Sequence, residues 1–327
     1  MERIKMEPGI YPGMSYDEYF KIDAVNNSLL RLIADQSPRR AKHLLDNPKL
    51  QTDAQRIGIA YHMGILEPEK FKQQCLIMPS FALNTTVGKQ AFQTYATELA
   101  LKKTITIAQC DEMVVAKKDK RDLLTAALAA SGKTILDQSD LDTINGMYEE
   151  LKQRPAFEWI QGGEAEVVIV WDDEVTGVRC KAKLDYLRRE DFVLADLKSS
   201  MAGDYINVSP KKFQKVIVDC AYDQQSAFYH DGYQALTGDD CHYMIIAQEK
   251  EAPYVELPYE VWPDTVDRGR VLYRKLLAEY KMFVGDDVWP GCWVEKFMDR
   301  PGHFNRGEVE YINASDWALK DAGVGPF

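Results

Sequence analysis

The sequence lacks any long hydrophobic run. No segment approaches the roughly 18 consecutive apolar residues that a membrane-spanning helix needs. Residues 1–20 contain no apolar stretch of the kind found in signal peptides. These absences argue against insertion into a membrane or export across one. We therefore expect a cytoplasmic protein with no membrane partner.

Cysteine is sparse and widely spaced. Six cysteines occur among 327 residues, and no two of them form a CxxC pair. A structural zinc site or a disulfide framework needs closer or more regular spacing. The cysteines are therefore expected to act as small apolar side chains.

Positive charge is in deficit. The chain carries 40 Lys and Arg residues against 51 Asp and Glu residues, for a net charge of −11. This balance argues against a protein that coats nucleic acid through bulk charge. An enzyme that holds cations with carboxylates can nevertheless be acidic overall and carry a local basic groove.

Three basic stretches are candidates for such a groove. They are residues 37–43, 209–215 and 299–306. Within them, Arg39, Arg40, Lys211 and Lys212 are candidate DNA contacts. Solvated surface charge explains each stretch about equally well.

The first half of the chain reads as mainly helical. Helical patterns cover residues 26–48, 53–75, 111–131 and 137–160, whereas 1–25 resembles a loop and 79–110 shows no clear element. Asn27 or Ser28 can cap the first helix of 26–48, and Ser37 can cap a second, with Pro38 in its first turn. Pro68 is expected to end or kink the helix that begins at 53.

The pattern changes at residue 164. Strand-like runs occupy 164–171, 178–187, 192–198, 242–248 and 254–260, and helical patterns occupy 209–238 and 264–285. The first three strands form a β-meander. We predict an α/β fold in a single domain over 1–327, with a central mixed β-sheet flanked by helices. An N-terminal helical extension (about 20–160) precedes the core (about 161–293), and a tail runs to 327.

Charged side chains interrupt the apolar strand at 192–198. Asp196 and Lys198 lie two residues apart and share one face of the strand. If Glu190 and Asp191 form the preceding turn, Asp185 lies directly opposite Asp196. Two opposed carboxylates about 5 Å apart repel each other unless a cation or a proton lies between them.

Glu166, on the strand before, can add a third carboxylate. Such a group suits a hard divalent ion, Mg²⁺ or Mn²⁺, in one or two copies. Lys198 beside it can hold an attacking water or stabilise charge on a phosphate. Taken alone, Asp-x-Lys is more often a surface ion pair, but the meander and the two further carboxylates favour a metal site.

These residues resemble the core of PD-(D/E)xK nucleases, which have a restriction-endonuclease-like fold. In that superfamily an Asp ends one strand, here Asp185, and an acidic-x-Lys motif lies on the next, here Asp196 and Lys198. The resemblance implies catalytic roles for these three residues. An endonuclease or other phosphodiesterase on the same core is the nearest alternative.

Two helical motifs resemble the RecB-like branch of the superfamily. Gln225 and Tyr229 share a helix face at i, i+4, and the resemblance gives them catalytic roles near the metal. His62, in GIAYHMGILEPEKF, resembles the histidine of that branch that reaches the metal. An ordinary amphipathic face and a core histidine are the competing interpretations.

Most of the chain, from about residue 20 to 293, resembles the exodeoxyribonuclease VIII (RecE-type) nuclease family of phages and prophages. The matching strings include NNSLLRLIADQSP, ADLKSS and QSAFYHDGY. That family often carries Arg two residues before the first core Asp. This chain has Lys183 there, which we take as a further candidate DNA contact.

The resemblance implies a metal-dependent exonuclease that acts on the ends of double-stranded DNA. It would degrade the 5′-ended strand and leave a 3′ single strand for an annealing recombinase. It also implies a homo-oligomeric ring, a trimer or tetramer, in the cytoplasm of a bacterial host. A non-catalytic DNA-binding protein that retains the fold, or an α/β protein with a chance ion pair, would explain the charges differently.

Overall fold

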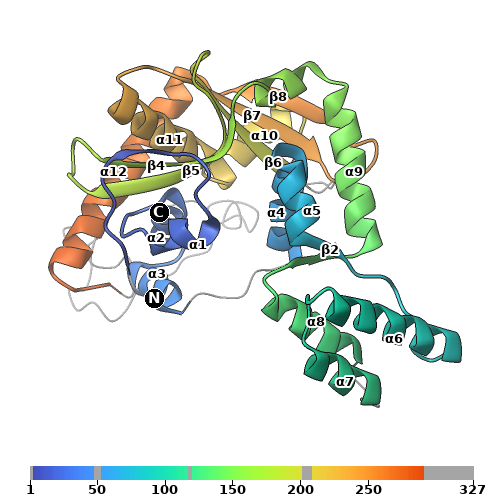
Figure 1. Cartoon of the computed structure of the whole chain (residues 1–327). Coiled ribbons are helices and arrows are strands. Elements are labelled where there is room, and N and C mark those ends of the chain that lie inside the picture. The colour runs from blue at the N-terminus through green and yellow to red at the C-terminus, as the bar shows by residue number, and fades with distance from the viewer. Residues whose placement is uncertain (1–2, 48–52, 117–119, 201–207, 291–327) are drawn as a thin grey trace, which may run out of the picture.

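The computed structural model describes residues 3–47, 53–116, 120–200 and 208–290 (Figure 1). Its helices are α1 (Tyr16–Lys21), α2 (Asn27–Asp35), α3 (Pro38–Asp46), α4 (Asp53–Leu66), α5 (Pro68–Gln74), α6 (Thr86–Leu101), α7 (Ile107–Val115), α8 (Lys120–Ala130), α9 (Gln138–Lys152), the 3-10 helix η1 (Pro155–Ile160), α10 (Pro210–Asp219), α11 (Tyr222–Thr237) and α12 (Pro263–Gly285). Its strands are β1 (Gly9–Tyr11), β2 (Cys75–Ile77), β3 (Thr134–Leu136), β4 (Glu164–Asp172), β5 (Arg179–Arg188), β6 (Val193–Ser200), β7 (His242–Glu249) and β8 (Glu256–Glu260).

A six-stranded sheet organises the molecule, in the order β1-β4-β5-β6-β7-β8. β6 and β7 are parallel, and α10 and α11 supply the crossover between them, whereas the other neighbouring strands are antiparallel. The predicted mixed sheet flanked by helices is confirmed. The predicted β-meander is also confirmed as β4, β5 and β6.

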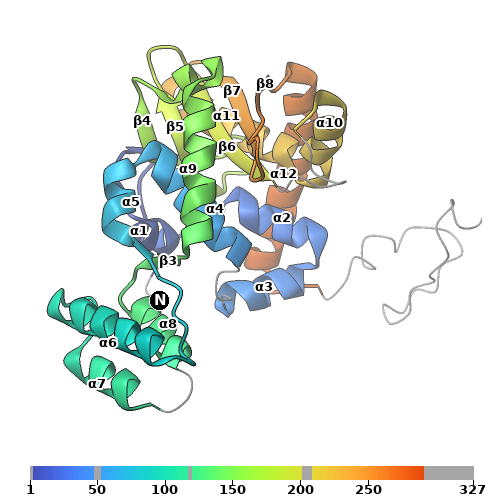
Figure 2. The ribbon, with the colours of Figure 1, turned by 90° about the vertical axis from the view of Figure 1, so that its right-hand side faces the viewer.

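Helices cover both faces of this sheet (Figures 1 and 2). On one face Trp171 of β4 packs against Phe228 of α11, and Phe228 packs in turn against Tyr273 of α12. On the other face, α4, α9 and η1 form a second apolar cluster with β6 and β7, in which Tyr61 and Leu197 are fully buried. The alternation of side chains along each strand supplies both clusters.

The helices α6, α7 and α8 form a lobe that projects away from the sheet in both views (Figures 1 and 2). Its apolar residues, among them Phe92, Met113 and Leu128, form a cluster of their own. The chain enters the lobe from β2 and leaves through β3, and these two strands pair in parallel at its base. The lobe includes 79–110, where the sequence indicated no clear element.

Several local predictions differ from the structure. The expected helix at 209–238 is two helices, because Ala221 adopts a left-handed conformation (φ 54°) between α10 and α11. Asn26 caps α2, one residue before the first predicted cap, whereas Ser37 caps α3 as predicted. The helix that begins at 53 ends at Leu66, just before Pro68, as predicted, and Pro68 begins the separate helix α5. The expected N-terminal loop contains β1 and α1.

None of the described helices combines the length and apolarity needed to cross a bilayer. The basic stretch 299–306 and the C-terminal tail beyond 290 lie outside the described residues.

Candidate metal centre

The candidate centre lies where β5 and β6 separate. Their ladder pairs Leu187 with Leu194 and Tyr186 with Ala195, which is the register predicted from the turn, and it ends there. Asp185 and Asp196 are the next residues on each strand. The side chain of Asp185 enters the gap, where its Oδ2 accepts a hydrogen bond from the Leu197 N–H at 2.9 Å.

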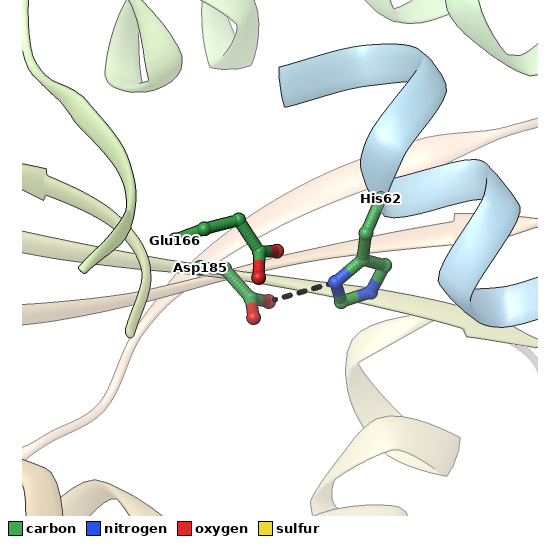
Figure 3. A group of neighbouring side chains, drawn as sticks. All are labelled: His62, Glu166 and Asp185. Carbon is green, nitrogen blue, oxygen red and sulfur yellow. Dashed lines mark ion pairs between the residues drawn. The ribbon is translucent and has the colours of Figure 1, made fainter. Parts of the chain in front are cut away.

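Three potential metal ligands meet beside this gap (Figure 3). One ligand atom each from His62, Glu166 and Asp185 lie within 4.8 Å of one another. The His62 Nδ1 is 3.4 Å from the Asp185 Oδ2, and His62 is presented by α4, the helix that packs across β5. The two carboxylates suit Mg²⁺ or Mn²⁺, and the imidazole, a ligand of first-row transition metals, fits Mn²⁺ better than Mg²⁺.

Glu166 reaches this group through an unusual backbone. Its φ of 56° is left-handed, although both neighbours stay in the β4–β5 ladder, where Ala165 pairs with Tyr186 and Val167 with Leu184. A non-glycine residue in this region costs about 1–3 kcal/mol and is concentrated at functional sites. The strain therefore supports a role for Glu166 beyond strand formation.

Lys183 lies against Glu166 in a buried ion pair. The exposed fractions are 9% for Lys183 and 5% for Glu166. The Lys183 ammonium also lies 3.6 Å from the centre of the Tyr16 ring of α1. This placement differs from the prediction of Lys183 as a DNA contact, because its charge is buried against a carboxylate and not presented on the surface.

Asp196 is held from a different side. Lys198 Nζ lies 2.5 Å from its Oδ2, and Gln225 Nε2 of α11 donates to its Oδ1 at 2.9 Å. The Lys198 ammonium lies 4.9 Å from the centre of the Tyr222 ring. The predicted shared face of Asp196 and Lys198 is therefore observed. Asp196 is adjacent to the three-residue ligand group but is not part of it.

Tyr229 lies one turn after Gln225 on α11. Its ring packs edge-on against Tyr243, with centroids 6.2 Å apart. Burial raises the pKa of Tyr229 well above its usual range, and the nearby charges of Asp196 and Asp185 add to this effect. The phenol therefore keeps its proton at neutral pH and remains a hydrogen-bond donor.

Burial and neighbouring charges also set the ionisation of the acidic and basic groups. Burial raises the pKa of Asp196 to about 6, against the opposing charge of Lys198. Burial alone would lower the pKa of Lys198, but the carboxylates of Asp196 and Asp185 raise it above the usual range. Burial alone would raise the pKa of Asp185, but His62 and Lys198 lower it. At neutral pH Asp185 is therefore ionised and available as a metal ligand, and Lys198 is protonated.

The remaining candidate DNA contacts lie on the surface. Arg39 and Arg40 are exposed in the first turn of α3, and Lys211 and Lys212 in the first turn of α10. The Arg39 side chain also donates to the Trp289 carbonyl at 3.3 Å. Their exposure is what a contact to DNA requires, and their role stays a prediction.

Sequence reasoning missed Tyr16. Its ring lies 3.6 Å from the Lys183 ammonium, and desolvation of its hydroxyl, together with the charges of Glu166 and Asp185, raises the pKa of that hydroxyl. A sequence signal for its helix did exist, because Ser15 and Glu18 have the spacing of a capping box and form one in the structure. No pattern indicated that this helix would lie over Glu166.

A family model described as "PDDEXK-like domain of unknown function (DUF3799)" matches residues 35–295. The chain belongs to this family. The match spans the ligand group and the Asp196–Lys198 strand, so the PDDEXK-like core expected from the motifs is confirmed. No curated protein matches the chain significantly.

Among solved structures, this PDDEXK-like chain is similar to one from Eubacterium rectale named "Putative exonuclease". The two share 12% sequence identity with a TM-score of 0.55, over 94% of this chain and 97% of the other. At that identity the similarity shows a shared fold. A structure named SSO0001 matches 68% of this chain and 85% of its own at 12% identity, but its TM-score of 0.26 is too low to support any conclusion.

Proposed function

We propose that this protein is a metal-dependent exonuclease that acts on the ends of double-stranded DNA. The observation that carries the proposal is the meeting of His62, Glu166 and Asp185 beside the Asp196–Lys198 pair, within a PDDEXK-like domain. The similarity in fold to a structure named as an exonuclease, over nearly the full length of both chains, supports the choice of an end-dependent enzyme.

The residues of the site have different roles in the proposed reaction. A divalent ion held by His62, Glu166 and Asp185 would lower the pKa of a bound water and neutralise charge on the scissile phosphate. Lys198 keeps its proton because two carboxylates lie near it, so it can donate to a phosphate oxygen or orient the attacking water. Gln225 holds Asp196, and Asp196 holds Lys198.

The finer features rest on the resemblance to the exodeoxyribonuclease VIII family. On that basis the enzyme degrades the 5′-ended strand, leaves a 3′ single strand and supplies it to an annealing recombinase. The same resemblance supports a homo-oligomeric ring, a trimer or tetramer, and a phage or prophage origin within a bacterial cytoplasm. The exposed Arg39, Arg40, Lys211 and Lys212 are then the proposed DNA contacts.

Digestion of end-labelled linear duplex DNA tests the proposal. We expect Mg²⁺-dependent loss of the duplex that begins at the 5′ label, and no cleavage of closed circular DNA. Lys198→Ala should be at least about 100-fold slower, as when one preorganised charge-stabilising donor is removed. Lys72→Ala is the matched control, because Lys72 is exposed on α5 and pairs with Glu69, one helical turn away.

Cleavage of the closed circular DNA would show that the enzyme is an endonuclease on the same core and not an exonuclease. No Mg²⁺-dependent cleavage of either DNA would contradict the proposal.

A further inference from the structure

A buried lysine side chain, that of Lys183, supplies a positive charge within the centre. Lys183 of β5 projects its ammonium onto the Glu166 carboxylate, and both side chains are nearly inaccessible to solvent. Glu166 is at the same time one of the three potential metal ligands. One of the ligands is therefore already paired with a positive charge.

The structure holds this lysine in place. The Tyr16 ring lies against its ammonium, and α1, which carries Tyr16, is anchored by the neighbouring lysine on β5. The Lys181 Nζ donates to the carbonyls of Tyr19 and Ile22, each at 2.8 Å. Removal of one partner from a buried ion pair is costly, so Lys183 stays beside Glu166.

The net charge of the centre determines how many divalent ions it can balance. Glu166, Asp185 and Asp196 contribute three negative charges, and Lys183 and Lys198 contribute two positive ones. One net negative charge remains. One divalent ion and one phosphodiester bring the total to zero, whereas a second divalent ion would leave two net positive charges in a partly buried site.

We propose that Lys183 is a resident cation that takes the place of a second metal ion, so that the centre holds a single divalent ion. This inference rests on the proposed metal-dependent function. It makes Lys183 a positioning residue, which acts through Glu166 on the metal and does not contact DNA.

Titration of the protein with Mn²⁺ in the absence of DNA tests the inference. Calorimetry gives the affinity and the number of bound ions, and electron paramagnetic resonance measures the Mn²⁺ that remains free. The wild type should bind one ion per chain. Lys183→Met keeps the length of the side chain but removes its charge, so the ion should bind at least about tenfold more tightly. Lys183→Arg keeps the charge and should retain one ion with near wild-type affinity.

Lys72→Met is the control for removal of a positive charge. Lys72 is exposed on α5, where its ammonium pairs with Glu69 and not with a metal ligand. Its loss should leave Mn²⁺ affinity within about threefold of the wild type, because an exposed charge is screened by solvent and salt.

The outcomes separate the inference from the proposed function. Two ions bound to the wild type, or unchanged or weaker binding in a folded Lys183→Met variant, would overturn the role of Lys183 and leave a metal-dependent nuclease in place. No ion bound to the wild type would overturn both. If Lys183→Met does not fold, the stoichiometries of the wild type and Lys183→Arg decide: one ion in each supports the inference, and two overturn it.

Discussion

At the scale of single residues, the side chains of the centre are charged or titratable although they are partly or fully buried. His62 shows this on α4, where an apolar helix face presents an imidazole to Asp185. The neighbouring Tyr61 is fully buried and bonded to Gln248. The hydrogen bond from Tyr61 to Gln248 therefore fixes α4 in the position that places His62 beside Asp185.

Substitution of His62 tests its part in metal binding. His62→Ala should weaken Mn²⁺ binding by about tenfold or more, because one potential metal ligand is lost. Calorimetric titration measures the effect. His43→Ala, at an exposed position of α3, is the control and should bind as the wild type does. Equal affinities for the two variants would remove His62 from the centre.

Asp196 should set the acidic limit of activity. Burial raises its pKa to about 6, so Asp196 takes up a proton as the pH falls through that value. The protonated form no longer holds Lys198 by charge. The cleavage rate at saturating Mg²⁺ should therefore fall about tenfold per pH unit below pH 6. A flat rate profile between pH 5 and 7 would contradict this role.

The three potential metal ligands and the Asp196–Lys198 pair were predictable from the sequence, whereas Tyr16 was not, and the contacts among the site residues were predictable only in part. Strand periodicity placed Asp196 and Lys198 together, and turn length placed Asp185 opposite Asp196. The pairing of Lys183 with Glu166 could not be derived, because it depends on the left-handed backbone of Glu166 and on α1. Both are consequences of tertiary packing.

At the scale of elements, α11 positions Gln225, which donates a hydrogen bond to Asp196. It packs closely against α12, where Gly269 meets the backbone of Asp223. An added Cβ at Gly269 would lie 1.9 Å from the Asp223 carbonyl oxygen. The two helices can approach this closely only because position 269 has no side chain.

Gly269→Ala should therefore separate α11 from α12. We expect a loss of about 2–3 kcal/mol in the free energy of unfolding, typical of overpacking, measured by chemical denaturation. Gly285→Ala is the control, because nothing lies within 4 Å of an added Cβ at that end of α12. Equal stability of the two variants would show that the helices adjust without cost.

Most strands and long helices were predictable because their apolar periodicity is regular. The break at Ala221 was not, since alanine favours the helix and only packing imposes its left-handed conformation. The short elements β1 and α1 were also missed. Each has six residues or fewer, which is too short for periodicity to indicate.

At the scale of the whole molecule, the α6–α8 lobe and the sheet have separate apolar clusters. The parallel pair β2–β3 brings the entry and exit of the lobe together at its base. The metal ligands all lie outside the lobe. These features indicate that the sheet and the centre do not depend on the lobe for their structure.

Replacement of residues 80–132 by a short Gly/Ser linker tests this separation. The variant should unfold cooperatively and bind Mn²⁺ with the affinity of the intact chain, since β2 and β3 need only a flexible connection between them. Circular dichroism and calorimetry measure both properties. Loss of cooperative folding would instead show that the lobe and the core form one folding unit, which is the single domain predicted from the sequence.

The central claim is a divalent-ion centre formed by His62, Glu166 and Asp185. Anomalous diffraction from crystals soaked in Mn²⁺ tests it most directly. The account predicts one anomalous peak, in contact with Asp185 and the two other ligands, that disappears in Asp185→Asn crystals. A peak elsewhere, or none at saturating Mn²⁺, would contradict it.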